Sequence, residues 1–200
     1  MSRRSRSRLL LALALVVAVV IAGVVRGGSA PSSAAPSKAA VAAAFAGSPP
    51  PLAALHAGGG ELRSGGVKAF QAQLRALRGH PVVVAEWGSW CPPCRAEFPV
   101  YQRVSVADGR TVAFLGLDVR DRPPGGAQLL RSFPVTFPSW LDPAGAIAAW
   151  LRSVAASPST AGGYPQTVLI DRRGVEVHDR SGPYESAAAL QRDIVRYLLG

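Results

Sequence analysis

The sequence reads VVVAEWGSWCPPCRAEF over residues 82–98, an apolar run followed closely by two cysteines that enclose two prolines. An apolar run of this kind is typical of a strand buried on both faces of a sheet. The residues from Cys91 to about Ala107 read as a helix, so both cysteines lie where a buried strand gives way to a helix. Cys91 falls at the helix N-terminus, and Cys94 lies almost one turn further along the same side.

This placement is suited to disulfide exchange. Unpaired N–H groups and the positive end of the helix dipole stabilise a thiolate at the position of Cys91. Cys94 is close enough to attack a mixed disulfide formed at Cys91 and release the substrate. Pro92 and Pro93 are consistent with the first helical turn, whose N–H groups have no partner within the helix. The motif predicts a redox-active disulfide that needs no further cofactor.

Other uses of paired cysteines fit the sequence less well. A zinc site requires two further ligands, but the chain has no other cysteine, and His56, His80 and His178 show no paired ligand spacing. Covalent haem attachment requires a histidine directly after the second cysteine, where an arginine stands. A structural disulfide stays open as an alternative, although so short a loop would stabilise the fold little. A catalytic Cys91 should be exposed and acidic, and a structural one should be buried and inert.

The composition excludes several classes of protein. Of the 200 residues, 48% are hydrophobic, as in a globular domain. The formal charge is +10, but six of the cations lie in the first forty residues, which leaves +4 for residues 41–200. No basic run interleaved with aromatic residues follows, so we expect no nucleic-acid partner. The two cysteines exclude a disulfide-rich secreted scaffold.

The N-terminus predicts export. Residues 9–25 carry no charge, and they are preceded by four arginines and followed by Arg26. Such a run is at the short end of what spans a bilayer, so residues 1–26 are expected to form an uncleaved signal anchor with a single membrane-spanning helix. The alternative is a cleavable signal peptide that ends near Ala30 and releases a secreted protein. In either case we expect the rest of the chain on the extracytoplasmic side.

Residues 27–60 are expected to form a tether to a domain at residues 61–200. Twenty-eight of these thirty-four tether residues are Ala, Gly, Ser or Pro, a composition that buries too little apolar surface to offset the entropy of ordering. Whether residues 49–60 pack on the domain stays open.

Helical and strand patterns alternate beyond the tether. Apolar residues recur at helical spacing over residues 67–77, and Gly79 and Pro81 end that helix. Further helices are expected at 128–132, 147–154 and 190–198, strands at 111–118, 167–171 and 175–179, and a short extended segment at 137–141. This order predicts an α/β fold with a mixed central sheet flanked by helices on both faces.

At these residues the chain resembles a known family, the membrane-anchored thiol–disulfide oxidoreductases of the TlpA, ResA and CcmG/DsbE type, whose fold is thioredoxin-like. The resemblance covers residues 62–200. Its motifs here are VVVAEWGSWCPPCRAEFPVYQ (82–102), FLGLDV (114–119), FPSWLD (137–142) and YPQTVLIDRRG (164–174). Residues 119–142 resemble the insertion by which this family differs from plain thioredoxin.

The resemblance implies roles for individual residues. Cys91 is the attacking thiol and Cys94 the resolving one. Trp90 resembles the aromatic residue that shields the pair. Glu97 resembles the acid often found just beyond it, where a carboxylate could accept a proton from a thiol; a solvated helix residue is the alternative.

Pro165 resembles the cis-proline that faces the disulfide in this family. The aromatic Tyr164 before it is a context in which the small trans preference of an X–Pro bond can be overturned by a tight turn. A proline entering a strand also leaves an unpaired edge to which a substrate chain could add. An ordinary trans-proline turn is the alternative.

Glu86 departs from the family pattern, which usually has an apolar residue here and a polar one at Ala85. A charge in a buried strand is costly unless it is paired or protonated. Glu86 could handle protons for Cys94, or it could reach a sheet edge or an arginine. Strand alternation favours the second, because neighbouring side chains point to opposite faces.

The resemblance implies an extracytoplasmic enzyme that exchanges disulfides with protein thiols, with reduction of substrate disulfides favoured, for example in cytochrome c maturation. It also implies a membrane-embedded electron-transfer partner, and we expect a monomer. One alternative is an oxidase that forms disulfides in exported proteins, and another is a non-catalytic peptide-binding module with a structural disulfide. The direction of exchange depends on the reduction potential relative to the electron partner.

Overall fold

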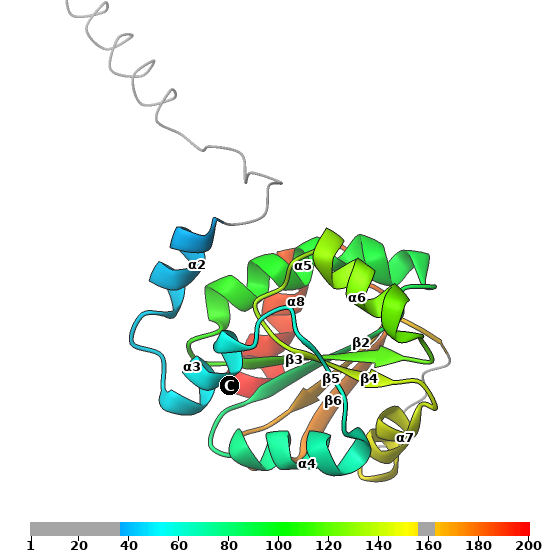
Figure 1. Cartoon of the computed structure of the whole chain (residues 1–200). Coiled ribbons are helices and arrows are strands. Elements are labelled where there is room, and N and C mark those ends of the chain that lie inside the picture. Colours follow the sequence, from blue (N-terminus) through cyan, green and yellow to red (C-terminus); the bar gives the residue numbers. More distant parts are fainter. Residues whose placement is uncertain (1–36, 156–162) are drawn as a thin grey trace, which may run out of the picture. The chain divides into compact units, whose positions relative to one another are not determined.

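The computed structural model describes residues 37–155 and 163–200 of the chain (Figure 1). Ala35–Gly200 forms one compact unit. The predicted anchor and the first part of the predicted tether lie outside the described residues. Among the described residues, no helix is both long and apolar enough to cross a membrane.

A mixed sheet of six strands lies at the centre of the fold, as predicted. Its order is β1-β4-β3-β2-β5-β6. The first four strands of this order run parallel, and β5 and β6 are antiparallel to their neighbours. The strands are β1 (Leu62–Arg63), β2 (Val82–Trp87), β3 (Ala113–Val119), β4 (Ser139–Asp142), β5 (Gln166–Ile170) and β6 (Glu176–Ser181).

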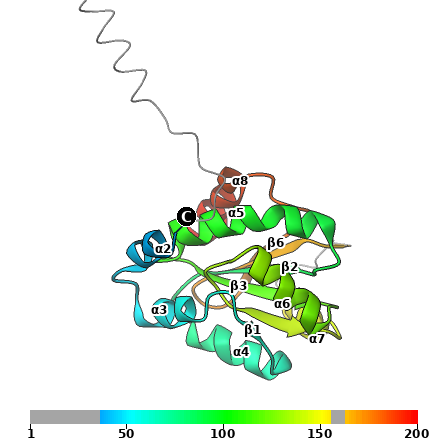
Figure 2. The ribbon, with the colours of Figure 1, turned by 45° about the horizontal axis from the view of Figure 1, so that its top comes forward.

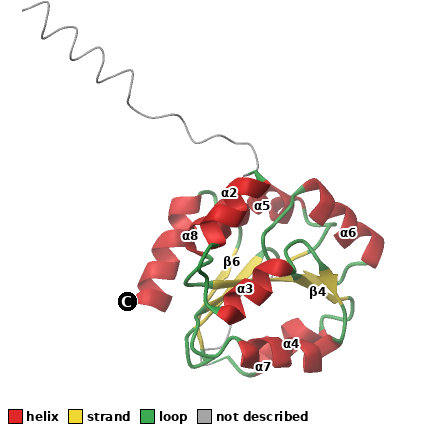
Figure 3. Ribbon diagram, turned by 60° about the vertical axis from the view of Figure 1, so that its left-hand side comes forward, coloured by secondary structure: helices red, strands yellow, loops and turns green. Residues whose placement is uncertain are grey.

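Helices cover both faces of the sheet (Figure 3). On one face lie α5 (Pro92–Asp108), α6 (Pro123–Ser132) and α8 (Ala187–Ile194), which continues as the π-helical η1 (Val195–Leu199). On the other face lie α4 (Gly66–Ala76) and α7 (Ala146–Ser153). The α/β fold with covered faces is thereby confirmed.

The two central strands are buried along their whole length. Because side chains alternate along a strand, Val83 and Ala85 of β2 pack with α5, whereas Val82 and Val84 pack with Phe70 of α4. Each large apolar side chain buried in this way stabilises the fold by roughly 1.5–3 kcal/mol. This packing fixes the end of β2, from which the cysteines follow.

The last part of the predicted tether belongs to the folded unit. Residues 38–57 form two helices, α2 (Lys38–Phe45) and α3 (Pro50–Ala57). Leu52 and Leu55 of α3 are buried in the core on the α4 face, which answers the question that the sequence left open. Helix α2 contributes no buried residue and lies beside the C-terminal end of α5 (Figure 2).

His56 joins this N-terminal segment to the rest of the domain. Its Nε2 lies 2.8 Å from the Gly109 carbonyl oxygen and its Nδ1 lies 3.3 Å from that of Thr136. The ring of Phe45 stacks on the imidazole at 3.6 Å. The segment is therefore held at α3 by apolar burial and at α2 by this stack.

Helix α6 begins at Pro123, five residues before the start that periodicity predicts. Its first turn is Pro-Pro-Gly-Gly, which carries no apolar periodicity and includes the weakest helix formers. Proline is tolerated at the first helical positions because no N–H bond is lost there. The region expected to be the family insertion thus holds α6 and β4.

Candidate functional site

The two cysteines lie at the junction of β2 and α5, as the sequence predicts. Cys91 is the N-cap of α5 and is joined to Cys94 by a disulfide, with their Cα atoms 5.3 Å apart. Cys91 Sγ accepts the N–H of Cys94 at 3.2 Å. Pro92 and Pro93 occupy the first helical positions. The sulfur of Cys91 therefore lies against the end of the helix that favours negative charge.

Both cysteines are buried in this disulfide-bonded form. Cys91 is 3% exposed and Cys94 is 1% exposed. This differs from the exposure that the sequence analysis expected of a catalytic Cys91. The difference arises from tertiary packing, because both cysteines belong to the apolar cluster that includes Ala85 and Phe98.

An aromatic pair lies next to Cys91. Trp90 is 49% exposed, and its indole N–H donates to the Val119 carbonyl at 3.1 Å. Its ring meets the ring of Tyr164 edge to face at 5.7 Å. The Tyr164–Pro165 peptide bond is cis, and Pro165 leads directly into β5. The packing thus brings Tyr164 to the residue just before the cysteines.

Glu97 lies one turn beyond Cys94 on α5 and is 2% exposed, so it is not the solvated residue of the alternative reading. One of its carboxyl oxygens accepts the N–H of Tyr184 at 2.5 Å. Burial raises the pKa of Glu97 to about 7, against the opposing effects of that N–H and of the Tyr101 hydroxyl. The carboxyl can therefore gain or lose a proton near neutral pH.

Glu86 lies on β2 next to Ala85, whose side chain belongs to the cluster that holds the cysteines, so strand alternation turns Glu86 to the other face. The Glu86 carboxylate is 3.6 Å from Arg152 Nη1 of α7. Burial raises its pKa to about 7, and the charge of Arg152 opposes this rise. The structure thus shows the arginine contact that the sequence analysis offered as one alternative, and strand alternation directs the Glu86 side chain away from the face that holds Cys94.

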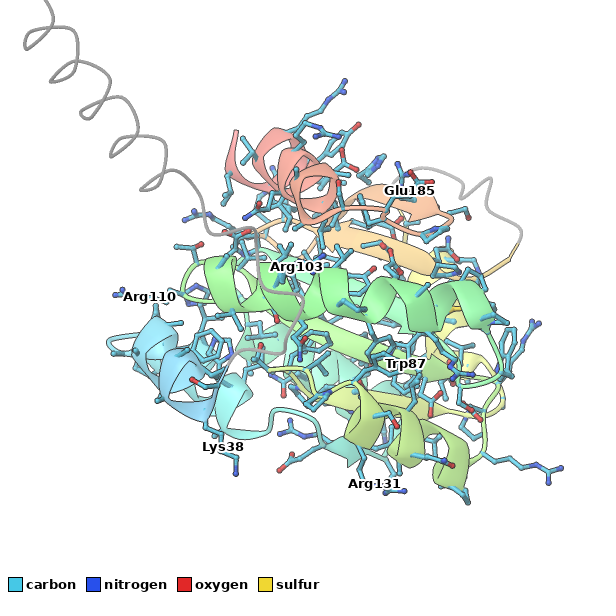
Figure 4. All side chains as sticks on the ribbon, turned by 90° about the horizontal axis from the view of Figure 1, so that it is seen from above. Lys38, Trp87, Arg103, Arg110, Arg131 and Glu185 are labelled. Carbon is cyan, nitrogen blue, oxygen red and sulfur yellow. A yellow bond between two sulfur atoms is a disulfide. The ribbon has the colours of Figure 1, made fainter. Side chains whose placement is uncertain are left out.

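Two aspartates lie beyond the predicted set, and one of them, Asp121, holds the segment that ends at Cys91, here called the redox loop (88–91). Asp121 accepts the N–H of Ser89 at 2.6 Å and that of Arg122 at 2.7 Å. Asp118, at the end of β3, is fully buried, and its carboxyl oxygens have no hydrogen-bond partner among the described residues. Trp87 of β2, labelled between α5 and α6 in Figure 4, is the register partner of Asp118 on the neighbouring strand β3.

Two consecutive glycines let α6 approach these aspartates. A Cβ on Gly125 would overlap Ser89 Oγ, and a Cβ on Gly126 would overlap Asp118 Oδ2. The signals that could have revealed this contact are the Gly-Gly pair within a helix and the acids that end a buried strand. The apolar periodicity used to predict helices and strands detects neither of these two signals.

In the part of the chain that the structure describes, no group of three or more His, Cys, Asp or Glu side chains converges. His56 and His178 each stack on an aromatic ring, that of Phe45 and that of Tyr197.

Comparisons with known proteins agree with this geometry. The DsbE thiol:disulfide interchange protein of Allochromatium vinosum is 29% identical over 126 residues, which are 60% of this chain and 64% of that protein. The DsbE homolog of Paracoccus denitrificans is 35% identical over 97 residues, 48% of each chain. The chain thus spans about half to two thirds of the length of these relatives.

The solved structure of MTB dsbF, described in mixed oxidized and reduced forms, is similar with a TM-score of 0.52 and 26% identity, over 61% of this chain and 84% of that one. This similarity confirms the thioredoxin-like fold. The Redoxin family model matches residues 63–194, which are well over half of the chain. The chain belongs to the Redoxin family.

Proposed function

We propose that this protein is an extracytoplasmic thiol–disulfide oxidoreductase that reduces disulfides in exported proteins through Cys91 and Cys94. The observation that carries the proposal is the position of Cys91 Sγ at the N-cap of α5, where it accepts the Cys94 N–H. A thiolate formed there is stabilised by that N–H and by the helix dipole. The similarity to DsbE proteins supports the same chemistry.

The reaction proceeds in two exchange steps, starting from the reduced protein. The Cys91 thiolate attacks one sulfur of a substrate disulfide, so that a mixed disulfide forms and the other substrate sulfur leaves as a thiolate. Cys94 then loses its proton and attacks the Cys91 sulfur, which forms the Cys91–Cys94 disulfide and releases the second substrate thiolate. The protein loses two electrons and the substrate gains them. A reducing partner, which we place in the membrane, returns the protein to the dithiol.

Glu97 supplies the proton acceptor for the second step. It is the carboxyl on α5 one turn beyond Cys94, and burial raises its pKa to about 7. A base is most effective when its pKa is near the working pH, so a carboxyl of this kind can take the Cys94 proton at neutral pH. Glu97→Gln should slow release of the mixed disulfide more than its formation.

Trp90 and Tyr164 offer the docking surface for the substrate segment that carries the disulfide. The indole of Trp90 is half exposed directly before Cys91, and Tyr164 braces it edge to face. Amphipathic aromatic rings of this kind give a large contact area at low entropic cost. Trp90→Ala should raise KM for a protein substrate while leaving reduction by a small dithiol close to normal.

The burial of Cys91 favours a second candidate function, a peptide-binding module in which the disulfide is only structural. The two functions differ in reduction potential and in turnover. A potential of about −270 to −200 mV together with reduction of insulin by the dithiol form supports the reductase. A reduction potential of about −120 mV supports an oxidase. A potential below about −300 mV, together with no turnover, supports a disulfide that is only structural.

We further propose that residues 1–26 anchor the protein in the membrane with the domain outside the cytoplasm. The support is the uncharged run at residues 9–25 behind four arginines. Fractionation should recover the chain in membranes with its N-terminus intact, and protease added to the outer side should digest it. A soluble form beginning near Pro31 would instead establish the cleaved signal peptide.

A further inference from the structure

Asp118 is a buried carboxyl on the cysteine side of the sheet that the proposed reaction does not use. It is fully buried at the end of β3, where it pairs with Trp87 of β2. Its neighbourhood holds two other buried polar atoms without a hydrogen-bond partner among the described residues, Trp87 Nε1 and Ser139 Oγ. An ionised carboxylate at such a position is costly, so the uncharged form of Asp118 is favoured.

Asp118 is connected to the redox loop by packing. Gly126 of α6 lies directly over its Oδ2, and the preceding Gly125 lies against both Ser89 Oγ and Asp121 Oδ1. The first turn of α6 therefore touches both carboxyls and the redox loop. A change in charge or position at Asp118 is transmitted to the loop over a short path.

Asp121 makes the direct contact with the loop. Its Oδ2 accepts the Ser89 N–H at 2.6 Å, two residues before Cys91, and its Oδ1 accepts the Arg122 N–H. Burial alone would raise the pKa of Asp121, but the side chain of Ser89, the N–H groups of Ser89 and Arg122, and the side chain of Asp118 more than offset it, so its pKa is lowered and it is charged. Hydrogen bonds to a charged acceptor are about twice as strong as those between neutral groups.

We propose that Asp118 is a positioning residue for the redox loop: while uncharged it lets Asp121 hold the Ser89 N–H, and when it ionises, repulsion between the two carboxylates weakens that hold. The proposal rests on the proposed function only in that the loop presents Cys91 to substrate. Burial raises the pKa of Asp118 to about 8, and the charge of Asp121 and the side-chain interaction between the two carboxyls add to the rise, which agrees with this coupling.

No neighbouring charge in the described structure neutralises Asp118. Besides Asp121, the charged residues on the elements around it are Glu61 and Arg63 at β1, Glu86 on β2, Arg95, Glu97, Arg103 and Asp108 on α5, Arg120 and Arg122 on either side of Asp121, Arg131 on α6, and Asp142 on β4. Arg63 pairs with Glu61 and Arg152 pairs with Glu86, and none of these residues forms an ion pair with Asp118. Its ionisation therefore meets the charge of Asp121 without compensation.

The test is amide hydrogen exchange at Ser89, measured by NMR on the full chain in detergent micelles between pH 6 and 9.5. After correction for the intrinsic rate, the Ser89 protection factor should fall by about tenfold as Asp118 ionises, the size expected when one charge-assisted hydrogen bond is lost. The carboxyl carbon of Asp118 should titrate with the same midpoint. Different midpoints for the two groups would overturn the proposal.

Asp118→Asn keeps the shape of the side chain but cannot ionise, so Ser89 protection should be independent of pH in this variant. The matched control is Glu97→Gln, which removes the other buried acid of this face and should leave the Ser89 transition in place. If Asp118→Asn does not fold, Asp121→Asn carries the test. Without the neighbouring charge Asp118 should titrate at lower pH, and an unchanged midpoint would contradict the pairing.

The rate of turnover tests whether the loosening of the redox loop on ionisation of Asp118 affects the reaction. The rate of insulin reduction by wild type, divided by that of Asp118→Asn at the same pH, should fall between pH 7 and pH 9, because only the wild-type loop loosens. A constant ratio would show that the loop movement does not affect the reaction. If neither protein reduces insulin, the proposed function fails, while the exchange measurement still decides whether Asp118 controls the loop.

Discussion

Replacement of Glu86 by Gln is expected to stabilise the protein at neutral and alkaline pH. Glu86 is 1% exposed, and burial raises its pKa from 4.5 to about 7 despite the guanidinium of Arg152 at 3.6 Å. At about 1.36 kcal/mol for each pH unit between the two values, keeping the ionised carboxylate in the fold costs ~3 kcal/mol.

The sign of the pH dependence follows from proton binding. Between pH 4.5 and about 7 the folded protein keeps a proton on Glu86 that the unfolded chain has lost. The free energy of unfolding contributed by this group therefore falls as the pH rises through that window and is constant above it. Glu86→Gln removes the ionisation, so it should gain about 1–3 kcal/mol over wild type at pH 8 and differ little at pH 4.

Urea unfolding of the oxidised full chain in mild detergent, at pH values from 4 to 8.5, measures this difference. Glu61→Gln is the matched control, because Glu61 is exposed and pairs with Arg63 at 2.8 Å. Its effect should stay below ~1 kcal/mol across the range. A Glu86→Gln variant less stable than wild type at pH 8 would show that the ion pair with Arg152 outweighs burial, and would refute the reasoning.

Three further outcomes are expected. Cys94→Ser should accumulate mixed disulfides with substrate on Cys91, detected by non-reducing electrophoresis and mass spectrometry, whereas adducts on Cys94 in Cys91→Ser would reverse the roles. Gly126→Ala should lower the free energy of unfolding in spite of a gain in helix propensity of about 1 kcal/mol, because its Cβ overlaps the Asp118 carboxyl; the loss should shrink in an Asp118→Ala background. His56→Leu should cost ~1–2 kcal/mol and expose α2 to protease, since it removes the contacts to Gly109 and Thr136.

The sequence was sufficient to predict the centre of the fold and the position of the cysteines. A β2 strand buried on both faces and a helix that begins beside Cys91 leave local signals, namely an apolar run and prolines that only a first turn tolerates. The start of α6 could not be predicted in the same way. Its Pro-Pro-Gly-Gly turn is determined by contact with Ser89 and Asp118, which come from distant parts of the chain.

The N-terminal helices and the burial of Cys91 also could not be predicted from local sequence patterns. Residues 38–57 are rich in Ala, Gly, Ser and Pro, and α3 is held by the fit of Leu52 and Leu55 into the core and by the contacts of His56 with distant residues. The small exposed fraction of Cys91 depends on the apolar cluster formed by several elements. Neither property has a periodic signature, because both depend on which segments meet in space.

Strand alternation decides which buried acid can serve the cysteines. Ala85 and Glu86 are neighbours on β2, so their side chains point to opposite faces, and the face of Ala85 is the one that holds Cys94. On this face the proposed proton acceptor comes from the helix instead, as Glu97 of α5. Glu86→Gln should therefore change stability and leave thiol reactivity unaltered, whereas Glu97→Gln should alter the pH profile of mixed-disulfide release. The two variants should differ in this way because Glu86 points to one face of the sheet, whereas Ala85 and the cysteines lie on the other.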